Sequence, residues 1–267
     1  MVKATYNEAK KLREFFDSRS ISVWLVSAWE VEKAKAQLND TDLILSVGGD
    51  GTILRATHVA APDMIPITGI NLGRLGFMTE LSADEALGKL PLLLAGEGWI
   101  DERAMLEAEL SATDQEPPRT FHALNDVVVA RGVIARLVHV EARINGQRLA
   151  TYKADGMIVA TATGSTGYSL AAGGPILHPQ SKDFLLVPIT PHLSPAYAMV
   201  LPSTTIAKLH IATAHQATLS IDGHINIPIS DGTTITVKYS PNTARFLRIH
   251  QKDSFYSSLE QKLKGKR

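Results

Sequence analysis

Apolar side chains recur every third or fourth residue at both ends of the chain. Residues 5–18 place Ala9, Leu12 and Phe16 on one face, and residues 255–263 place three apolar side chains four residues apart. Such spacing predicts amphipathic helices whose apolar faces need a surface to cover. We therefore expect a helix at each end, and we expect the C-terminal helix to return to the first domain.

Two capping boxes predict further helices, one over residues 31–38 and one through about Leu94. The boxes consist of Ser27 with Glu30 and Ser82 with Glu85. Apolar runs at 21–26, 43–47 and 65–70 are too short for helices and predict strands. Strands that alternate with helices indicate a parallel sheet, with ligands bound at the carboxyl ends of its strands.

From residue 101 onward, apolar and polar residues alternate, as they do over 138–144 and 217–229. Asn145-Gly146 is a strong hairpin turn, and the faces of the second pair match if its loop holds the three residues from Asp222 to His224. Short strands with frequent turns indicate a β-rich, largely antiparallel domain. We expect an α/β domain over residues 1–100, completed by about 245–267, and a β-rich domain over 101–244.

The composition narrows the class of protein. The 267 residues are 45% hydrophobic and 20% charged, which is typical of a globular protein. Lys+Arg and Asp+Glu both number 27, so the chain lacks the excess of positive charge that is typical of a protein with a nucleic-acid target. The absence of cysteine excludes disulfides and thiolate metal sites, and no apolar run is long enough to cross a membrane. We expect a cytoplasmic protein without a membrane or nucleic-acid partner.

The candidate chemistry begins in residues 41–60. An apolar strand runs into the sequence GGDG at 48–51, and a helix is expected to open at Thr52. The glycines let a ligand approach the backbone, and the free N–H groups of a helix N-terminus bind phosphate. Neither the P-loop lysine nor a G-x-G-x-x-G pattern is present. Asp50 adds a carboxylate to the turn; the alternative is that Asp50 only caps the helix.

A second glycine-rich segment covers residues 153–175. After an apolar strand over 157–160, four hydroxyl side chains lie among glycines, and Tyr168 offers a flat face to a base or ring. A polar ligand could be hydrogen-bonded along this loop, although such residues also form plain connectors. Two such loops in one chain favour a nucleotide or phosphate site. The nine histidines show no metal-ligand spacing, so we expect no metal site built by the protein itself.

Taken together, these segments resemble the NAD kinases. The resemblance rests on GGDGT at 48–52, NLGRLGFMTE at 71–80, ALND at 123–126, DGMIVATATGSTGYSLAAGGP at 155–175 and DG at 222–223. GGDGT alone is shared with phosphofructokinases and with lipid kinases of the diacylglycerol and sphingosine type, whereas the N-x-G-x-L-G-F and T-G-S-T-x-Y segments are more specific. The resemblance implies phosphorylation of the adenosine 2′-hydroxyl of NAD to give NADP, with ATP or polyphosphate as donor. It also implies that the β-rich domain over 101–244 binds NAD, that a cleft lies between the domains, and that the protein forms a homodimer or homotetramer.

The resemblance further implies roles for individual residues. Asp50 falls on the catalytic aspartate, and the phosphate-binding positions are Gly48, Gly49, Gly51 and Thr52. The NAD-binding positions are Asp50, Gly51, Phe77, Asn125, Asp126, Lys153, Asp155, Thr163, Thr166, Gly167, Tyr168 and Asp222. The chain departs from the usual pattern at Asp126, Ala162, Gly167 and Ala171, where the family commonly has Glu, Pro, Ala and Ser.

Phosphoryl transfer needs an in-line hydroxyl, neutralised phosphate charge and a place for the proton. We expect Asp50 to hydrogen-bond the hydroxyl and to take its proton late, and Mg²⁺ to enter with the phosphoryl donor. Two alternatives are a GGDGT-type lipid or sugar kinase and a non-catalytic, NAD-binding regulatory protein. The hydroxyl-rich loop at 161–169 is the opposite of the apolar pocket that a lipid kinase requires.

Overall fold

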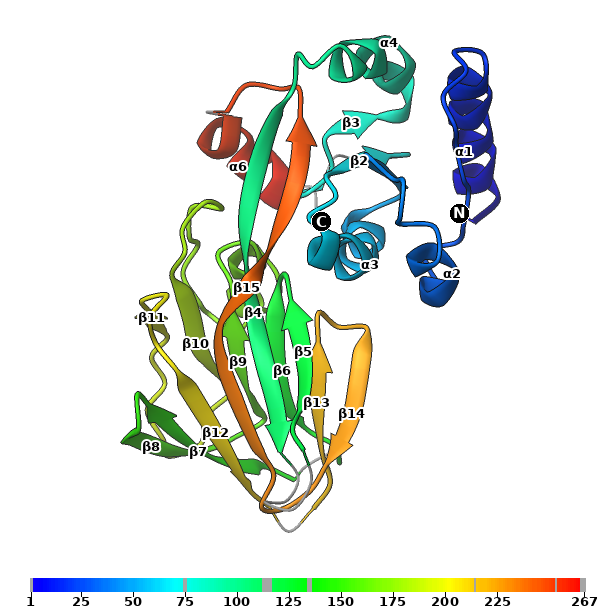
Figure 1. Cartoon of the computed structure of the whole chain (residues 1–267). Helices are drawn as coiled ribbons and strands as arrows, with labels where there is room; N and C mark the ends of the chain where they lie inside the picture. Colours follow the sequence, from blue (N-terminus) through cyan, green and yellow to red (C-terminus); the bar gives the residue numbers. More distant parts are fainter. Residues whose placement is uncertain are drawn as a thin grey trace. The chain divides into compact units, whose positions relative to one another are not determined.

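The computed structural model describes residues 2–73, 76–111, 117–133, 136–213, 215–252 and 254–264. The chain divides into two compact units (Figure 1). Unit 1 comprises Met1–Glu102 and Ala244–Arg267, and unit 2 comprises Arg103–Thr243. The chain leaves unit 1 within strand β4 (Trp99–Ser111) and returns within β15 (Thr234–Arg248).

Unit 1 contains a parallel sheet with helices on both faces (Figure 1). Its strands are β1 (Ile44–Val47), β2 (Ile67–Asn71) and β3 (Leu81–Ser82), and β2 also pairs in parallel with Phe246 of β15. Its helices are α1 (Val2–Asp17), α2 (Val31–Lys35), α3 (Asp50–Ala60), the 3₁₀ turn η1 (Ala61–Asp63), α4 (Ala83–Leu94) and α6 (Ser254–Lys264). Leu12 and Phe16 of α1 pack with Leu90 of α4 on one side of the sheet, and α3 lies on the other.

Three local predictions in unit 1 are wrong. Residues 21–26 form no strand: Ile21 and Val23 pack against the apolar cluster of α1 and α4 but join no ladder. Neither capping box forms, because no side-chain cap bond is present at α2 or α4. The Glu30 carboxylate pairs with Lys33, and the Ser82 hydroxyl donates to the Glu85 carboxylate instead of receiving a backbone N–H.

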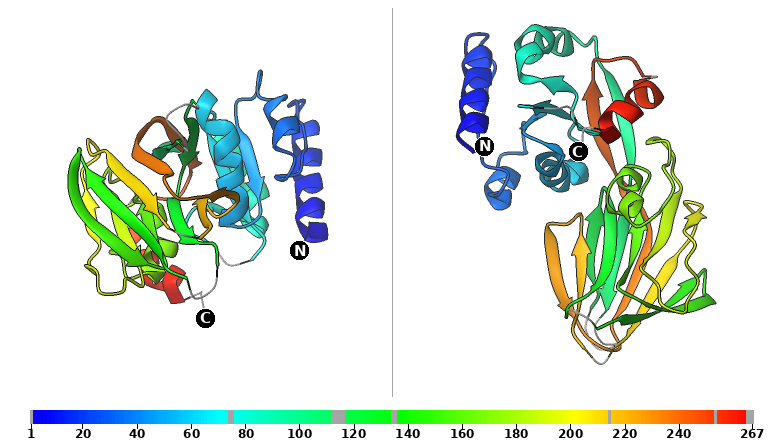
Figure 2. Two further views of the ribbon diagram at one scale, coloured as in Figure 1. Left: turned by 90° about the horizontal axis from the view of Figure 1, so that it is seen from below. Right: turned by 180° about the vertical axis from the view of Figure 1, so that it is seen from behind.

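Unit 2 consists of two sheets with a shared apolar core (Figure 2). The first sheet contains β4, β5 (Arg119–Ala123), β7 (Val138–Ile144), β8 (Gln147–Ala154), β12 (Ala207–Ala212) and β15. The second has the order β11 (Met199–Leu201), β10 (Phe184–Ile189), β9 (Gly156–Ala160), β6 (Asp126–Arg131), β13 (Ala217–Ile221) and β14 (Ile225–Ile229). Every pair in this second sheet is antiparallel.

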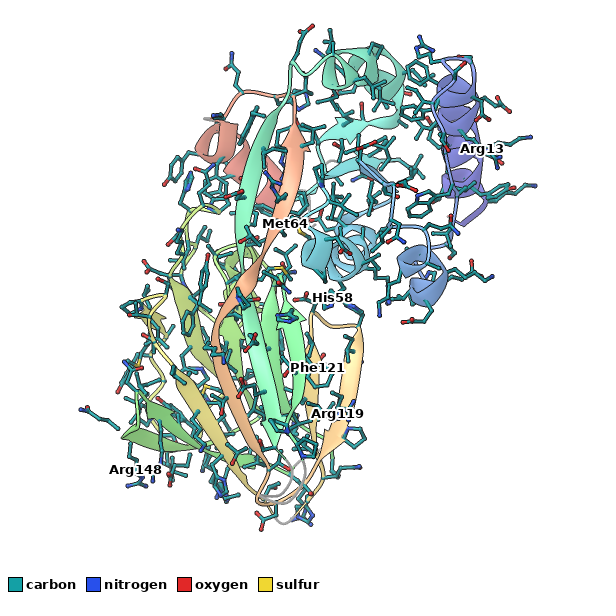
Figure 3. The ribbon with its side chains drawn as sticks, viewed as in Figure 1. Arg13, His58, Met64, Arg119, Phe121 and Arg148 are labelled. Carbon is teal, nitrogen blue, oxygen red and sulfur yellow. The ribbon has the colours of Figure 1, made fainter. Side chains whose placement is uncertain are left out.

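The turn chemistry of unit 2 agrees with the sequence. Asn145-Gly146 joins β7 to β8, and Asp222–His224 joins β13 to β14 with Ile221 opposite Ile225, so both hairpin predictions are confirmed. The surface of the first hairpin is polar: Glu141 of β7 pairs with Arg143 and with Arg148 of β8 (Figure 3).

Strands β9 and β10 are buried along their whole length. The outward-facing residues of β9 and β10 pack with Ala172 and Leu177 of the following loop, which explains why these strands read as unbroken apolar runs. The loop itself contains the 3₁₀ turn η2 (Gly164–Thr166) and the short helix α5 (Tyr168–Ala171). The predicted α/β first domain and the largely antiparallel second domain are therefore confirmed. None of the helices in the described part of the chain has the length and apolarity needed to cross a bilayer.

Candidate active site

The GGDG turn connects β1 to α3. Of its three glycines only Gly48 has a positive φ, at 146°, and its N–H donates to the Ile70 carbonyl of β2 at 2.8 Å. Gly49 is extended and precedes the helix, and Gly51 already lies within α3. A Cβ at position 48 would meet the hydroxyl of Thr52, in the first turn of α3. The turn therefore brings the positive end of the α3 dipole to the carboxyl end of β1.

Asp50 does not cap α3. The helix begins at Asp50 itself, Gly49 is its N-cap, and no side-chain cap bond forms. The half-buried carboxylate instead accepts the backbone N–H of Phe77 at 2.9 Å and that of Met78 at 3.2 Å, one on each oxygen. The side chain is thus held by the segment that follows β2, and the alternative of a plain helix cap is wrong.

That segment approaches Asp50 very closely at Gly76. A Cβ built on Gly76 would overlap the Asp50 carboxylate, so no larger residue fits without moving it. The Gly76 N–H donates to the hydroxyl of buried Thr79 at 2.7 Å, and the Glu80 N–H donates to the Gly69 carbonyl of β2 at 2.8 Å. These bonds fix the backbone around Phe77. Residues 74 and 75 of the NLGRLGFMTE motif lie outside the described residues.

A second carboxylate organises the corner between β5 and β6 in unit 2. Asp222 is 6% exposed, and its two oxygens accept three backbone N–H groups, from Leu124 at 2.8 Å, Asn125 at 2.7 Å and Asp126 at 3.0 Å. The Asp222 N–H returns a bond to the Asp126 carbonyl at 3.0 Å. Asp222 therefore holds the backbone of the Asn125-Asp126 pair in place. The local sequence indicated only that Asp222 lies at a hairpin tip.

The side chains of Asn125 and Asp126 carry the polar groups of this corner that differ from their ordinary state. The Asn125 Oδ1 atom is buried and has no hydrogen-bond partner within the described ranges. Asp126 is 7% exposed; burial, and then the charge of Asp222, raises the pKa of its carboxyl to about 7. One partner-free acceptor thus stands beside one carboxyl that can both donate and accept near neutral pH.

The hydroxyl-rich loop uses most of its hydroxyls internally. Thr161 donates to the Leu124 carbonyl at 2.5 Å, and Ser165 and Thr166 donate to carbonyls three residues earlier. The Thr163 hydroxyl accepts a bond from buried Arg103 at 3.4 Å. Gly167 separates η2 from α5, and Tyr168 begins α5 with 47% of its surface exposed. Tyr168 is therefore the side chain of this loop most available to a flat ligand.

Two predicted NAD-binding residues, Lys153 and Asp155, are not brought to this corner. Both precede β9, whereas Thr161 follows it. The five residues of β9, each advancing the strand by roughly 3.3 Å, therefore separate Lys153 and Asp155 from Thr161. The Asp155 carboxylate lies 3.0 Å from Arg131 Nε, and Lys153 is exposed on β8. Within one chain, the structure gathers Asn125, Asp126, Asp222 and the loop from Thr161, and leaves Lys153 and Asp155 at the opposite end of the strand.

Two residues important to this geometry were not singled out from the sequence. Gly76 allows the approach to Asp50, and Thr161 bonds through its hydroxyl and its N–H to the Leu124 and Asn125 carbonyls. Gly76 lies in the N-x-G-x-L-G-F motif, and Thr161 is one of the four hydroxyl residues of the second glycine-rich segment, but neither pattern indicated these contacts. No group of three or more His, Asp or Glu side chains in the described residues is arranged to hold a metal ion.

Comparisons with known proteins agree across both units. Family models match the ATP-NAD kinase N-terminal domain at residues 2–98 and the ATP-NAD kinase C-terminal domain at 124–249. An NAD kinase of Dehalococcoides mccartyi is 51% identical over 257 residues, covering 96% of this chain and 90% of the relative. One of Chloroflexus aurantiacus is 38% identical, with 92% of both chains covered.

Two solved structures share the fold. An NAD kinase from Archaeoglobus fulgidus in complex with ATP superposes with a TM-score of 0.78 at 28% identity, covering 96% of this chain and 94% of that one. Yeast NADH kinase complexed with NADH superposes with a TM-score of 0.77 at 29% identity, covering 84% and 66%.

The fold, the oriented carboxylate and these matches define the class: the chain is a kinase built from two domains. It belongs to the NAD kinase family. The GGDGT-type lipid or sugar kinase is not favoured, because the match extends over both domains and not over the GGDGT turn alone.

Proposed function

We propose that this protein phosphorylates the 2′-hydroxyl of the adenosine ribose of NAD, giving NADP, with ATP as the phosphoryl donor. The family supports the choice of substrate. The observation that carries the chemistry is the half-buried Asp50 carboxylate, which lies at the positive end of α3 and is oriented by two backbone N–H groups.

The geometry of Asp50 suits a hydroxyl acceptor. Each of its oxygens already accepts one N–H, and a carboxylate oxygen has a second lone pair for a substrate hydroxyl. In the transfer, the hydroxyl oxygen forms a bond to the γ-phosphorus, the bond to the β-phosphate bridging oxygen breaks, and ADP leaves. The hydroxyl proton passes to Asp50. Because the transition state of phosphoryl transfer is loose, the proton leaves late and orientation matters more than basicity.

In unit 2, we propose that Asn125 and Asp126 bind the adenosine part. The amide oxygen of Asn125 has no partner in the described residues, and an adenine amino group is the donor it needs. Asp126 offers its carboxyl to a ribose hydroxyl, and Tyr168 offers a flat face. Asp222 acts indirectly by holding the backbone of the pair.

For the phosphates, we propose the turn at Gly48, Gly49 and Gly51 with the first turn of α3, including Thr52. Helix N-termini bind phosphate through free N–H groups and the helix dipole. Mg²⁺ would be held by the phosphates of ATP and would neutralise their charge, because this ion keeps several waters and is commonly held through substrate phosphates.

One assay tests the substrate assignment. The purified protein is incubated with ATP and Mg²⁺ and with NAD, NADH, a diacylglycerol or a hexose phosphate in parallel, and with polyphosphate in place of ATP. We expect NADP from NAD and ATP. Phosphorylation of the lipid or sugar alone, or NAD binding without NADP, would support the other kinases or the non-catalytic regulator and overturn the proposal.

Replacing the carboxylate tests the role of Asp50. In Asp50→Asn we expect the NAD dissociation constant to change by only a few-fold, while turnover falls on the order of a hundredfold or more. Binding and turnover are measured on the same preparation, by titration and by NADP formation.

Cytoplasmic localisation and assembly as a homodimer or homotetramer complete the proposal. The cysteine-free sequence fits a reducing compartment. Sedimentation equilibrium of the purified chain counts the subunits, and a monomer throughout the micromolar range would contradict the assembly.

A further inference from the structure

A buried ion cluster lies within unit 1 beside the segment that orients Asp50. Arg248, at the end of β15, is 5% exposed, and its two carboxylate partners Glu80 and Asp101 are 6% and 2% exposed. Arg248 Nη1 lies 3.1 Å from Glu80 Oε2, and Arg248 Nε lies 3.3 Å from Asp101 Oδ2. The cluster thus joins the end of β15, the start of β4 and the residue before β3.

The same guanidinium reaches the backbone that holds Asp50. Arg248 Nη1 donates to the Met78 carbonyl at 2.8 Å, and the Met78 N–H donates to Asp50 Oδ1 at 3.2 Å. A single residue therefore links Arg248 to the Asp50 carboxylate. The other donor, Phe77, is the residue before Met78, so a shift of this backbone would turn both N–H groups.

Glu80 also binds the residues that follow β15, through the carboxylate oxygen that does not contact Arg248. Its Oε1 accepts the backbone N–H groups of Ile249 and His250, both at 2.8 Å, and His250 Nδ1 lies 3.1 Å from the same oxygen. The segment from Gly76 to Glu80 is consequently tied at its far end to the residues that follow β15.

An ion cluster of this kind is a costly way to obtain stability alone. Removing three charged groups from water is unfavourable, and apolar residues of similar volume often stabilise a fold as well. Arginine differs from an apolar residue because its planar guanidinium donates hydrogen bonds in fixed directions to several acceptors at once. We propose that Arg248 is a positioning residue for phosphoryl transfer, which holds the Met78 backbone and thereby sets the orientation of the Asp50 carboxylate. This inference rests on the proposed function of Asp50.

The test begins with Arg248→Lys, which keeps the positive charge and loses the fork. We expect kcat to fall about tenfold while KM for NAD and for ATP changes less than about threefold, because the carboxylate is misdirected and the substrate contacts are intact. The matched control is Arg245→Lys, three residues earlier on β15, whose side chain is 34% exposed and whose Nε lies 3.6 Å from the Glu102 carboxylate. Its kcat should equal that of the wild type.

A double-mutant cycle separates positioning from a structural role. Single-turnover NADP formation is measured for Asp50→Asn, Arg248→Lys and the double variant, with melting temperatures recorded for all. If Arg248 acts through Asp50, adding Arg248→Lys to Asp50→Asn should lower the rate by less than about twofold. The same tenfold loss in both backgrounds, or a lower melting temperature with unchanged kcat, would overturn the proposal.

Two further outcomes are informative. Should Arg248→Lys fail to fold, Glu80→Gln replaces it, since the amide keeps the shape and loosens the hold on Arg248; its kcat should fall about threefold, and a wild-type kcat contradicts the inference. A slow Asp50→Asn with a fully active Arg248→Lys refutes only the role of Arg248. Normal turnover of Asp50→Asn refutes the proposed role of Asp50 and the inference with it.

Discussion

Asp50 in unit 1 and Asp222 in unit 2 both accept backbone N–H groups, but the two carboxylates differ in burial and in the number of groups that they accept. Each carboxylate accepts backbone N–H groups from a segment far away in the sequence, 27 residues away for Phe77 and 98 for Leu124. Asp50 is half-buried and takes two N–H groups, whereas Asp222 is buried and takes three. Asp50 retains acceptor capacity for a substrate, while Asp222 is committed to the backbone of its neighbours.

The comparison shows that a carboxylate on a motif position can be engaged by the backbone of a distant segment. Asp222 shapes the corner, and its negative charge raises the pKa of Asp126 in addition to the effect of burial. Asp50 is itself held by another segment, which donates two N–H groups to it and approaches it closely at Gly76. Variants that disturb the segment around Asp50 should therefore change turnover. Variants that disturb the corner held by Asp222 should change NAD binding and the stability of unit 2.

After Asp50→Asn, the largest expected effect comes from moving the Asp50 carboxylate without removing it. In Gly76→Ala the new Cβ collides with the carboxylate, so the side chain must turn away. We expect kcat to fall roughly tenfold to a hundredfold, with NAD affinity nearly unchanged, because misplacement of a catalytic group by about 1 Å is costly. Steady-state kinetics measure this.

The control for that variant is Gly88→Ala in α4, where nothing lies within 4 Å of an added Cβ. It should keep wild-type kcat and gain slightly in stability, since alanine favours a helix. If Gly76→Ala also turned over normally, the precise placement of Asp50 would not matter.

Next in size is Asp222→Asn, which turns one acceptor oxygen into a donor facing backbone N–H groups. We expect the unfolding free energy of unit 2 to fall by about 2–4 kcal/mol and the NAD dissociation constant to rise about tenfold. Urea titration and NAD titration report the two quantities. Asp231→Asn is the matched control, because that carboxylate is exposed and, among the described residues, accepts one backbone N–H, from Thr213 at 2.9 Å. Equal melting of the two variants would contradict the framework role of Asp222.

A smaller effect is expected in the pH dependence of stability. The pKa of Asp126 is raised from 3.8 to about 7 in the folded protein, so between these values the folded state binds a proton that the unfolded state has released. The contribution of Asp126 to stability is therefore fully present below pH 4 and is lost as the pH rises toward 7. Relative to Asp126→Asn, the wild type should lose on the order of 2 kcal/mol between pH 5 and pH 7. A constant difference over this range would rule out the raised pKa.

The smallest effect should come from the surface of unit 2. Glu141 pairs with Arg143 at 2.8 Å, and the neighbouring guanidinium lowers the pKa of this carboxyl. Exposed ion pairs contribute little, so Glu141→Gln should shift the melting temperature by no more than about 1 °C and leave NADP formation unchanged. A marked loss of activity would mean that this hairpin takes part in the reaction.

Elements with a clear period were predictable from the sequence. The helix through Phe16, the strand before Gly48 and both hairpins follow from the spacing of apolar residues and from turn residues. Residues 21–26 were predicted to be a strand and are not one. Apolar spacing predicts burial, but the hydrogen bonds of a strand depend on where a neighbouring strand lies.

The candidate site was predictable in its residue types and only partly in its geometry. Asp50 stands out in a glycine-rich turn after a buried strand, whereas Asn125 and Asp126 were identified only through the resemblance to the NAD kinases. The partners of Asp50 and Asp222, and the buried Arg248 cluster, come from tertiary contacts between distant segments, for which one sequence carries no local signal. The placement of Asp155 before β9, at the end away from Asp126, follows from strand direction, and the motif alone could not show it.

The most direct test of the account compares Asp50→Asn with Asp222→Asn in one experiment, with NAD affinity and single-turnover NADP formation at saturating NAD measured for both. We predict a crossed result: Asp50→Asn binds NAD within a few-fold of the wild type and transfers the phosphoryl group on the order of a hundredfold more slowly, whereas Asp222→Asn binds weakly and, once saturated, transfers within about threefold of the normal rate. Loss of turnover in both variants with binding intact, or in neither, would contradict the division of roles between the two carboxylates.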